Sequence, residues 1–317
     1  MTDVTKIHTP VLRERCVELL RPALEGGGLF VDCTLGMGGH AEAVLEAFSD
    51  VHVIGIDRDQ DALDIAKARL HSFASRVTFV HAAYDEVASV VATHAGAGAQ
   101  GILFDLGVSS LQLDRADRGF AYAQDAPLDM RMNVDDTLTA AHVLAEYSEG
   151  ELAHIFRAYG DEKLAGRYAR AIVGARAQYP ILRSAQLVSI LTDATPGALL
   201  GAGHPAKRVF QALRIEVNEE LSIIERAIPA AIDALAVGGR IVVMSYQSLE
   251  DKIVKRALTT MSTSQSPLDL PVEREEDRPV LRMLTRGAEQ ASDEERSRNP
   301  RSIPVRLRAA EKIREAA

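Results

Sequence analysis

Short apolar runs alternate with amphipathic segments from the start of the chain to about residue 106. The apolar runs predict strands at residues 28–32, 51–57, 76–80 and 101–106. Apolar residues at helical spacing predict helices at residues 8–24, 41–48, 59–73 and 85–93. Asp59 stands where the third of these helices needs an N-cap residue. Strands and helices that alternate in this way are typical of a parallel, doubly wound sheet.

The alternation stops between about residues 114 and 213. Helical patterns fill this segment, at residues 140–147, 149–159, 163–178 and 185–192, and no convincing strand interrupts them. It then resumes with a helix at 217–235, a strand at 238–245, a helix at 249–260 and two strands at 280–284 and 305–308. The pattern predicts an α/β fold. Residues 1–113 and 214–317 form a Rossmann-like domain, and residues 114–213 form an all-helical domain inserted into it.

Composition excludes several classes of protein. The two cysteines among 317 residues, Cys16 and Cys33, provide neither a disulfide framework nor the spacing of a metal site. No segment resembles a signal peptide, and no apolar run approaches the roughly 18 residues of a membrane span. We therefore expect a cytoplasmic protein without a metal site or a membrane partner.

Charge is distributed unevenly along the chain. The net charge is −9, yet residues 163–215 contain eight basic residues and one acid, which leaves −16 for the remainder. A basic segment in an acidic protein indicates a local site for a polyanion such as a nucleic acid, although a solvated helix face would show the same composition. Lys163, Arg167 and Arg170 are spaced to share one helix face. Lys207, Arg208 and Arg214 lie where the chain is expected to return to the sheet.

A glycine turn follows the first predicted strand. Gly36, Gly38 and Gly39 lie between that strand and the next helix, where glycine permits a tight turn and a close approach to a ligand. The spacing is also compatible with a dinucleotide site, or with a turn that binds nothing. Acids at the ends of the predicted strands, Asp32, Asp57 and Asp105, argue against a dinucleotide because they would repel its pyrophosphate. They would attract the ammonium and sulfonium groups of S-adenosylmethionine (SAM).

The acceptor of a methyl group remains open from spacing alone. If it is an exocyclic amine, Asp105 or Ser109 could hold its hydrogens and orient its lone pair. Methylation at cytosine C5 would need a nucleophilic cysteine, but Cys33 adjoins a predicted core strand and Cys16 falls in a predicted helix. An Asn/Asp-Pro-Pro-Tyr motif, typical of amine methylation, is also absent from the sequence.

Motifs along nearly the whole chain resemble those of one family. They are His8-Thr-Pro-Val-Leu12, Gly36-Met-Gly-Gly-His40, Ile56-Asp-Arg-Asp59, Asp105-Leu-Gly-Val-Ser-Ser110, Pro127-Leu-Asp-Met-Arg-Met132, the run from His204 to Ile215, Ser248-Leu-Glu-Asp251 and Asn299-Pro-Arg301. The set resembles the bacterial family of ribosomal small-subunit methyltransferases H (RsmH, or MraW). The resemblance implies a class I SAM-dependent methyltransferase fold with a helical insertion. It also implies N4-methylation of a cytidine in the decoding region, around the P site, of 16S ribosomal RNA in the small subunit.

The resemblance assigns functional residues by motif. The SAM contacts would be Gly38, Gly39, His40, Asp57, Tyr84, Asp105 and Gln112. Chemistry supports most of them, since Asp57 can accept two ribose hydroxyls, Tyr84 offers a stacking face, and Asp32 could contact the methionine ammonium. Where the family often has Ser-Phe-His-Ser-Leu-Glu-Asp, this chain has Gln247 in place of the histidine. Glutamine cannot accept a proton near neutral pH, so either the family requires no histidine base or the proton is lost to water here. The first is favoured, because the methylated ammonium is strongly acidic and loses its proton easily.

Two other classes of function stay open. A methyltransferase of DNA or protein would share the pocket without needing the basic segment, and a SAM- or RNA-binding protein without catalysis would need no path for an acceptor beside Asp105. The six basic residues from Lys163 to Arg214 named above are the predicted RNA contacts. The oligomeric state, for which a homodimer is one alternative, does not follow from the sequence.

Overall fold

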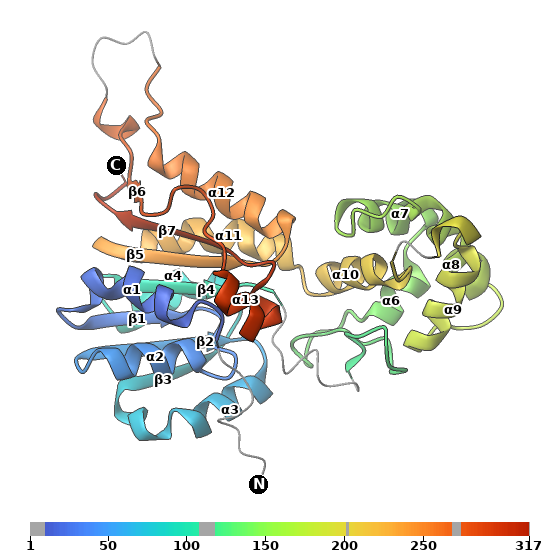
Figure 1. Ribbon diagram of the computed structural model, residues 1–317, viewed down its shortest axis with the longest axis horizontal. Coiled ribbons are helices and arrows are strands. Elements are labelled where there is room, and N and C mark those ends of the chain that lie inside the picture. The colour runs from blue at the N-terminus through green and yellow to red at the C-terminus, as the bar shows by residue number, and fades with distance from the viewer. Residues whose placement is uncertain (1–9, 108–117, 201–202, 268–273, 317) are drawn as a thin grey trace. The chain divides into compact units, whose positions relative to one another are not determined.

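The structure, a computed structural model, describes residues 10–107, 118–200, 203–267 and 274–316. Its described residues fall into two compact units. The sheet unit consists of the described residues up to Gly107 and from Leu221 onward, drawn in blue to cyan and in orange to red (Figure 1). Those from Arg118 to Glu220 form the helical unit, drawn in green to yellow.

A seven-stranded sheet organises the sheet unit. Its strands are β1 (Gly28–Asp32), β2 (Val51–Asp57), β3 (Val77–His81), β4 (Ala99–Asp105), β5 (Leu235–Ser245), β6 (Leu281–Met283) and β7 (Arg306–Lys312). They lie in the order β3-β2-β1-β4-β5-β7-β6. Strands β1 to β5 are parallel to one another, and β7 is antiparallel to β5 and β6. This arrangement confirms the predicted α/β class with a doubly wound parallel sheet.

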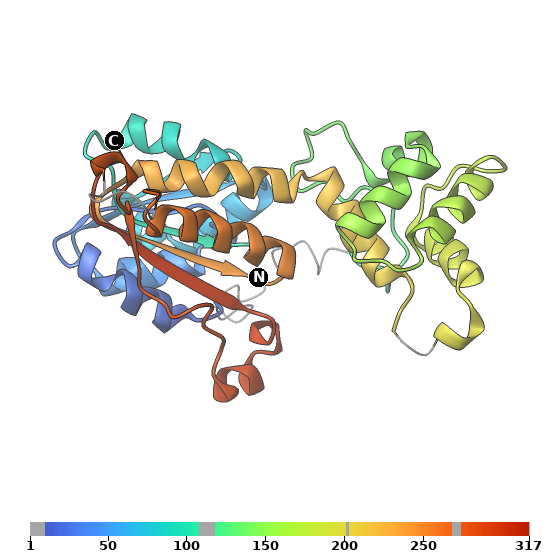
Figure 2. The same ribbon diagram turned by 90° about the horizontal axis from the view of Figure 1, so that it is seen from above.

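Helices cover both faces of this sheet (Figure 2). One face packs against α1 (Arg13–Leu24), α2 (Gly39–Ala47) and α3 (Gln60–Arg69). The other packs against α4 (Val87–His94), α11 (Glu220–Ala234) and α12 (Ser248–Ser262). Alternation of side chains along each strand supplies both cores, since Phe30 points to the first face and Val31 to the second.

Most predicted elements appear with small shifts at their ends. The Asp59 side chain caps α3 by accepting from the Asp61 amide at 3.1 Å, as predicted. The helix is shorter than expected, because the chain changes to a 3₁₀ helix at His71–Arg76. Strand β5 is longer, and it begins at Leu235 before the Gly238-Gly239 pair. A short helix, α13 (Asp293–Arg298), was not predicted.

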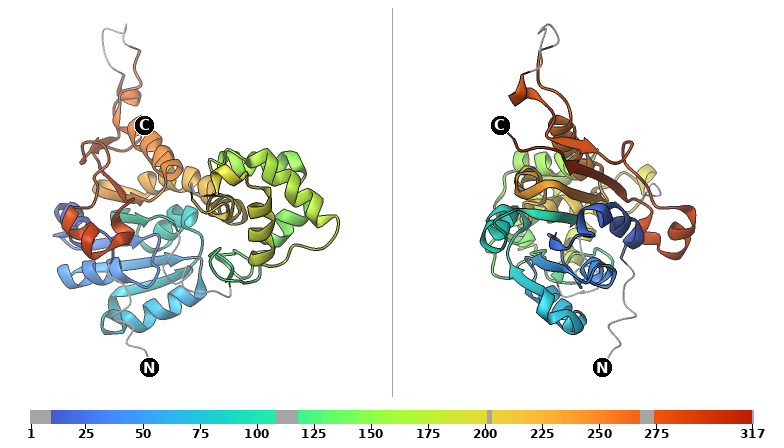
Figure 3. Two further views of the ribbon diagram at one scale, coloured as in Figure 1. Left: turned by 45° about the vertical axis from the view of Figure 1, so that its right-hand side comes forward. Right: turned by 90° about the vertical axis from the view of Figure 1, so that its left-hand side faces the viewer.

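Helices surround one core in the helical unit (Figure 3). They are α6 (Ala140–Glu146), α7 (Glu149–Ala158), α8 (Ala165–Arg176), α9 (Ser184–Ala194) and α10 (Ala206–Val217). No strand is assigned within the described part of this unit, although Pro127 and Arg183 form an isolated bridge. Helix α10 was not predicted, and it continues past residue 213, where the sequence placed the domain boundary.

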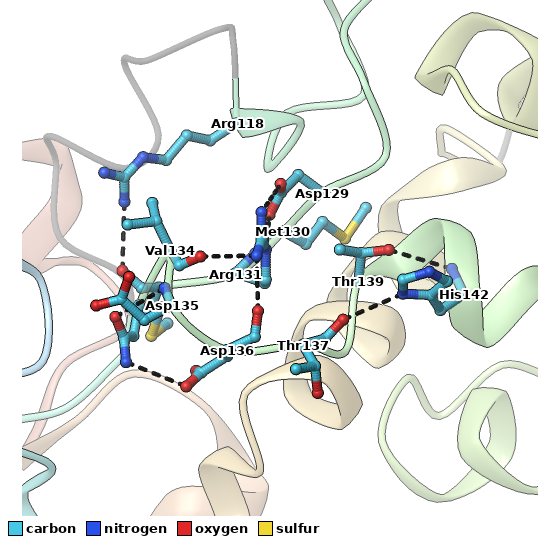
Figure 4. A network of polar contacts seen from close by, with 12 residues as sticks. Arg118, Asp129, Met130, Arg131, Val134, Asp135, Asp136, Thr137, Thr139 and His142 are labelled. Carbon is cyan, nitrogen blue, oxygen red and sulfur yellow. Dashed lines mark hydrogen bonds and ion pairs between the residues drawn. The ribbon is translucent and has the colours of Figure 1, made fainter.

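A loop before α6 is held by its own polar groups (Figure 4). The Arg131 guanidinium binds the Asp129 carboxylate and also the carbonyl oxygens of Val134 and Asp136. Met130 adopts a left-handed conformation with φ 61° and is fully buried. Buried Asn218 accepts from the Met132 amide at 2.7 Å and donates to the Met130 carbonyl at 2.7 Å. This part of the 127–132 motif therefore stabilises the helical unit.

Candidate functional site

Three acids end three neighbouring strands of the sheet. Asp57, Asp32 and Asp105 are the last residues of β2, β1 and β4, which lie side by side in that order. Because these strands are parallel, their carboxyl ends meet at one edge. The strand order also reverses between β1 and β4, because β2 and β3 lie on one side of this pair and β5 on the other, as at the ligand crevice of doubly wound folds. The structure thus brings the predicted acids to the position where such sheets bind ligands.

The glycine turn between β1 and α2 is tied to Asp57. Gly36 and Gly38 have φ of 51° and 78°, and the Gly36 amide donates to Asp57 Oδ2 at 2.7 Å. A Cβ on Gly39 would lie 2.4 Å from Pro10 Cγ, and one on Gly38 would lie 3.2 Å from Leu70 Cδ1. Packing inside the protein therefore already demands glycine at residue 39, and the positive φ favours it at residue 38. Their contact with a ligand stays a prediction.

Asp57 is held in place by backbone groups. Its Oδ1 accepts from the Asp59 amide at 2.9 Å, while Oδ2 accepts from Gly36. Each carboxylate oxygen has a second lone pair, so the group can still accept two hydroxyls. Burial raises the pKa of Asp57 to about 6, with the two amide bonds opposing the shift.

Asp32 and His40 have unsatisfied polar atoms at the same edge. The Asp32 side chain is 1% exposed, and only its Oδ1 has a partner, the Thr34 amide at 3.2 Å. Asp32 Oδ2 and His40 Nε2 are both buried without a hydrogen-bond partner among the described residues. Burial raises the pKa of Asp32 to about 7. A buried polar atom without a partner is costly, and a ligand with an ammonium group would satisfy the Asp32 oxygen.

Asp105 is connected to two residues that the sequence did not reveal. The Tyr246 hydroxyl donates to Asp105 Oδ1 at 2.7 Å, and the Asp105 amide donates to Thr34 Oγ1 at 2.6 Å. Tyr246 follows β5 directly, and its own amide donates to Glu250 Oε2 at the start of α12. No local pattern could have indicated the first contact, because it joins residues 141 positions apart.

Tyr84 lies after β3, as predicted, in a 3₁₀ turn that covers Tyr84–Glu86. Its ring meets the edge of Phe104, the residue before Asp105, with ring centroids 5.8 Å apart. Two further predicted residues, Ser109 and Gln112, lie outside the described residues.

Cys16 and Cys33 are fully buried, and burial raises the pKa of both thiols well above the usual range. Neither cysteine is placed or ionised as a nucleophile would be.

Comparison with known proteins identifies the family. The model of the MraW methylase family matches residues 5–313. The chain belongs to this family. A ribosomal RNA small subunit methyltransferase H from Leifsonia xyli is 62% identical over 309 residues, which cover 97% of this chain and 95% of the relative. Its counterpart from Clavibacter michiganensis is 60% identical and covers 97% of each chain.

Solved structures are more distant from this MraW family member. An rRNA methylase from Streptococcus thermophilus is 12% identical with a TM-score of 0.42, covering 94% of this chain and 93% of that one. A putative rRNA-methylase from Clostridium thermocellum is 13% identical with a TM-score of 0.44, covering 97% and 98%. At these values the structural likeness carries no argument, so the family rests on the sequence matches.

Five of the six predicted RNA contacts are exposed on the helical unit. They are Lys163, Arg167, Arg170, Lys207 and Arg208. Arg167 and Arg170 lie on one face of α8. Lys163 precedes that helix instead of sharing it, which corrects the predicted helix start. Arg170 contacts Glu149 at 3.4 Å, and Arg208 donates to the Asp161 carbonyl at 2.8 Å. Both contacts leave other donors of the guanidinium available.

Arg214 does not belong with these five. It forms two hydrogen bonds with the Glu220 carboxylate, at 2.7 and 2.9 Å, and its side chain is only 11% exposed. Its charge is therefore paired inside the helical unit. Its contact with RNA stays a prediction, and the other five residues are the better candidates. Arg176 and Arg183 of the same basic segment are engaged as well, with the Leu144 carbonyl and Asp125 respectively.

The described residues of this MraW family member contain no group of three His, Cys, Asp or Glu side chains that could hold a metal ion. None of their helices is long and apolar enough to span a membrane.

Proposed function

We propose that the protein transfers a methyl group from SAM to ribosomal RNA of the small subunit. The observation that carries this proposal is the row of three carboxylates at the ends of β2, β1 and β4, which favours a cationic cofactor without phosphate. Relatives up to 62% identical over nearly the whole chain carry the name ribosomal RNA small subunit methyltransferase H. Family and site chemistry therefore support the same activity.

The residues at the strand ends fit the parts of SAM. Asp57, fixed by two amides, would accept the ribose hydroxyls, and Asp32 with His40 would accept the hydrogens of the methionine ammonium. Tyr84 would stack on the adenine, and the turn from Gly36 to Gly39 would follow the ligand. SAM supplies a methyl group on a sulfonium, which is already activated. The protein then contributes mainly alignment, which provides up to about 7–11 kcal/mol in favourable cases.

A cytidine N4 amine in the decoding region is the acceptor we propose. Asp105 accepts a hydrogen of this amine and turns its lone pair toward the methyl group, with Ser109 as a second acceptor. Attack through C5 is disfavoured because neither cysteine is available as a nucleophile. Gln247 cannot remove the proton that the amine loses, so the methylated ammonium releases it to water.

The helical unit is the part of the chain that we propose to bind RNA. It corresponds to the insertion that the sequence places at residues 114–213, extended here to the end of α10. Lys163, Arg167, Arg170, Lys207 and Arg208 are exposed and suited to phosphates. Contacts to phosphates position an RNA without reading its sequence, so groups near Asp105 would have to select the flipped cytidine.

Methyl transfer to purified small subunits tests this function. The protein is incubated with SAM carrying a labelled methyl group and with small subunits, DNA or a protein mixture. Mass spectrometry of the nucleosides then distinguishes N4-methylcytidine from C5-methylcytidine. We expect label in 16S ribosomal RNA as N4-methylcytidine. Label in DNA or protein would overturn the proposal that ribosomal RNA is the substrate. SAM binding without any methyl transfer would indicate a SAM-binding protein without catalysis.

A further inference from the structure

Tyr246 contacts the proposed catalytic carboxylate of Asp105 from the end of the neighbouring strand. Its hydroxyl donates to Asp105 Oδ1 at 2.7 Å, within the usual range for a hydroxyl bonded to a carboxylate. The ring packs against the core on the α1–α3 face of the sheet. Burial raises the pKa of Tyr246 well above its usual 10, so the hydroxyl keeps its proton and stays a donor.

The two oxygens of Asp105 have different surroundings. Oδ1 receives the Tyr246 hydroxyl, whereas Oδ2 faces His40 Nε2 at 3.7 Å, which is too long for a hydrogen bond. His40 Nε2 is itself buried without a hydrogen-bond partner in the part of the chain that the structure describes. The Asp105 side chain is 28% exposed, so the carboxylate is still accessible. Oδ2 is thus the oxygen that a ligand can reach, and a ligand N–H could bind it beside His40.

Tyr246 is itself held firmly. Its amide and the Gln247 amide both donate to Glu250 Oε2, at 2.9 and 3.0 Å, at the junction between β5 and α12. On the opposite side, the Asp105 amide is bonded to Thr34 of the glycine turn. The carboxylate is therefore fixed from two strands, β4 through its backbone and β5 through Tyr246.

We propose that Tyr246 is a positioning residue for methyl transfer. It binds Oδ1 and thereby directs Oδ2 toward the cofactor and the acceptor amine. A free carboxylate rotates about χ2, and a donor on one oxygen removes that freedom before the ligand binds. This inference rests on the proposed function, because it assigns Tyr246 a role through Asp105 in that reaction.

The full-length Tyr246→Phe protein tests the proposal, because it loses one hydroxyl and keeps the packed ring. SAM affinity is measured by calorimetry, and turnover is measured with small subunits at saturating SAM. We expect turnover to fall about tenfold and the SAM dissociation constant to rise about threefold, as for the loss of one charged hydrogen bond. Tyr147→Phe is the matched control. Tyr147 also donates to a carboxylate, Glu216, at 2.6 Å, but lies in the helical unit.

A double-mutant cycle separates positioning from general support of the fold. In an Asp105→Ala protein there is no carboxylate to orient, so adding Tyr246→Phe should change SAM affinity and turnover by less than about twofold. A structural role would instead give the same loss in both backgrounds, which would overturn the proposal. An unchanged Tyr246→Phe protein would also overturn it. The proposed function is tested separately with the wild-type protein. If the wild type neither binds SAM nor methylates subunits, both the proposed function and the role of Tyr246 are overturned.

Discussion

Asp32 and Asp57 are buried at positions where apolar side chains would make the unbound protein more stable. Each carries two acceptor oxygens into the edge of the sheet, and burial raises both pKa values, to about 7 and about 6. The bonds from Thr34, Gly36 and Asp59 satisfy only part of each group. Such groups destabilise the unbound protein, and a cationic ligand offsets that cost on binding.

Stability of the unbound protein should therefore depend on pH through Asp32. Its pKa rises from 3.8 when unfolded to about 7 when folded, so protonation favours the folded state. This contribution is complete below about pH 4 and is lost as the pH rises through 7. Asp32→Asn should match the wild type near pH 4 and be more stable by roughly 4 kcal/mol at pH 8. Denaturant unfolding at several pH values measures this difference.

Binding should show the opposite trend. SAM needs Asp32 ionised, so its affinity for the wild type should increase between pH 6 and pH 8. Asp32→Asn should bind SAM more weakly at pH 8 and lose this dependence. Calorimetry of SAM binding to both proteins between pH 6 and pH 8 measures this difference. A variant that keeps both the affinity and the pH dependence of the wild type would remove Asp32 from the cofactor site.

Asp105→Asn is the corresponding test of the acceptor site. The substitution keeps the shape but removes the charge, and it replaces one acceptor oxygen with a donor. Misalignment of the reacting groups should lower turnover at least about 100-fold. The folded protein should persist, with SAM binding measured alongside. Near-normal turnover would exclude Asp105 from the mechanism.

The sequence predicted the position of a residue correctly where that residue ends a recognisable strand. Asp32, Asp57 and Asp105 each follow an apolar run, and parallel pairing brings such ends together. Tyr246 and Thr34 could not be found in this way, because their contacts with Asp105 span 141 and 71 residues. The packing reason for Gly39 also depends on a distant residue, Pro10.

Helix α10 illustrates the same limit at the level of elements. Val209, Phe210, Leu213 and Val217 are buried and fall at helical spacing, so the periodicity was present in the sequence. The basic residues Lys207, Arg208 and Arg214 nevertheless suggested one continuous RNA contact at the return to the sheet. Only the structure shows that Arg214 points to Glu220 while Lys207 and Arg208 are exposed.

Arg214 and Glu220 should therefore affect stability more than RNA binding. The two side chains are 11% and 7% exposed, and Arg214→Met would leave the Glu220 carboxylate buried without its guanidinium partner. We expect a loss of about 3–5 kcal/mol in unfolding free energy. The double variant Arg214→Met, Glu220→Leu should recover most of this loss, because no unpaired charge remains. Denaturant unfolding of the three proteins measures the effect.

The outcome distinguishes two roles for Arg214. If it binds phosphate, Arg214→Met should weaken binding to small subunits without a change in stability, and Glu220→Leu should not compensate. Either of these results would contradict the assignment of Arg214 to a structural ion pair.

Across the whole molecule, charge separates cofactor binding from RNA binding. The sheet unit contains the carboxylates that attract a cationic cofactor, while the helical unit contains the exposed basic residues. An RNA phosphate would be repelled from the first set and attracted by the second. The chain can therefore be acidic overall, at −9, and still bind RNA through one of its units.

Reversal of Arg167 and Arg170 to glutamate tests this division. Both residues are exposed on α8. The double variant should raise KM for small subunits at least about tenfold. It should also lower the slope of log binding constant against log salt concentration by about two, as for the loss of two phosphate contacts. SAM affinity and the unfolding temperature should not change, because neither side chain enters a core. Arg256 and Arg274, exposed on the sheet unit, provide a control with the same change in charge. If both double variants bind subunits equally well across salt concentrations, the α8 face is only solvated. The RNA must then lie elsewhere, with the basic run from Arg296 to Arg308 as the next surface to test.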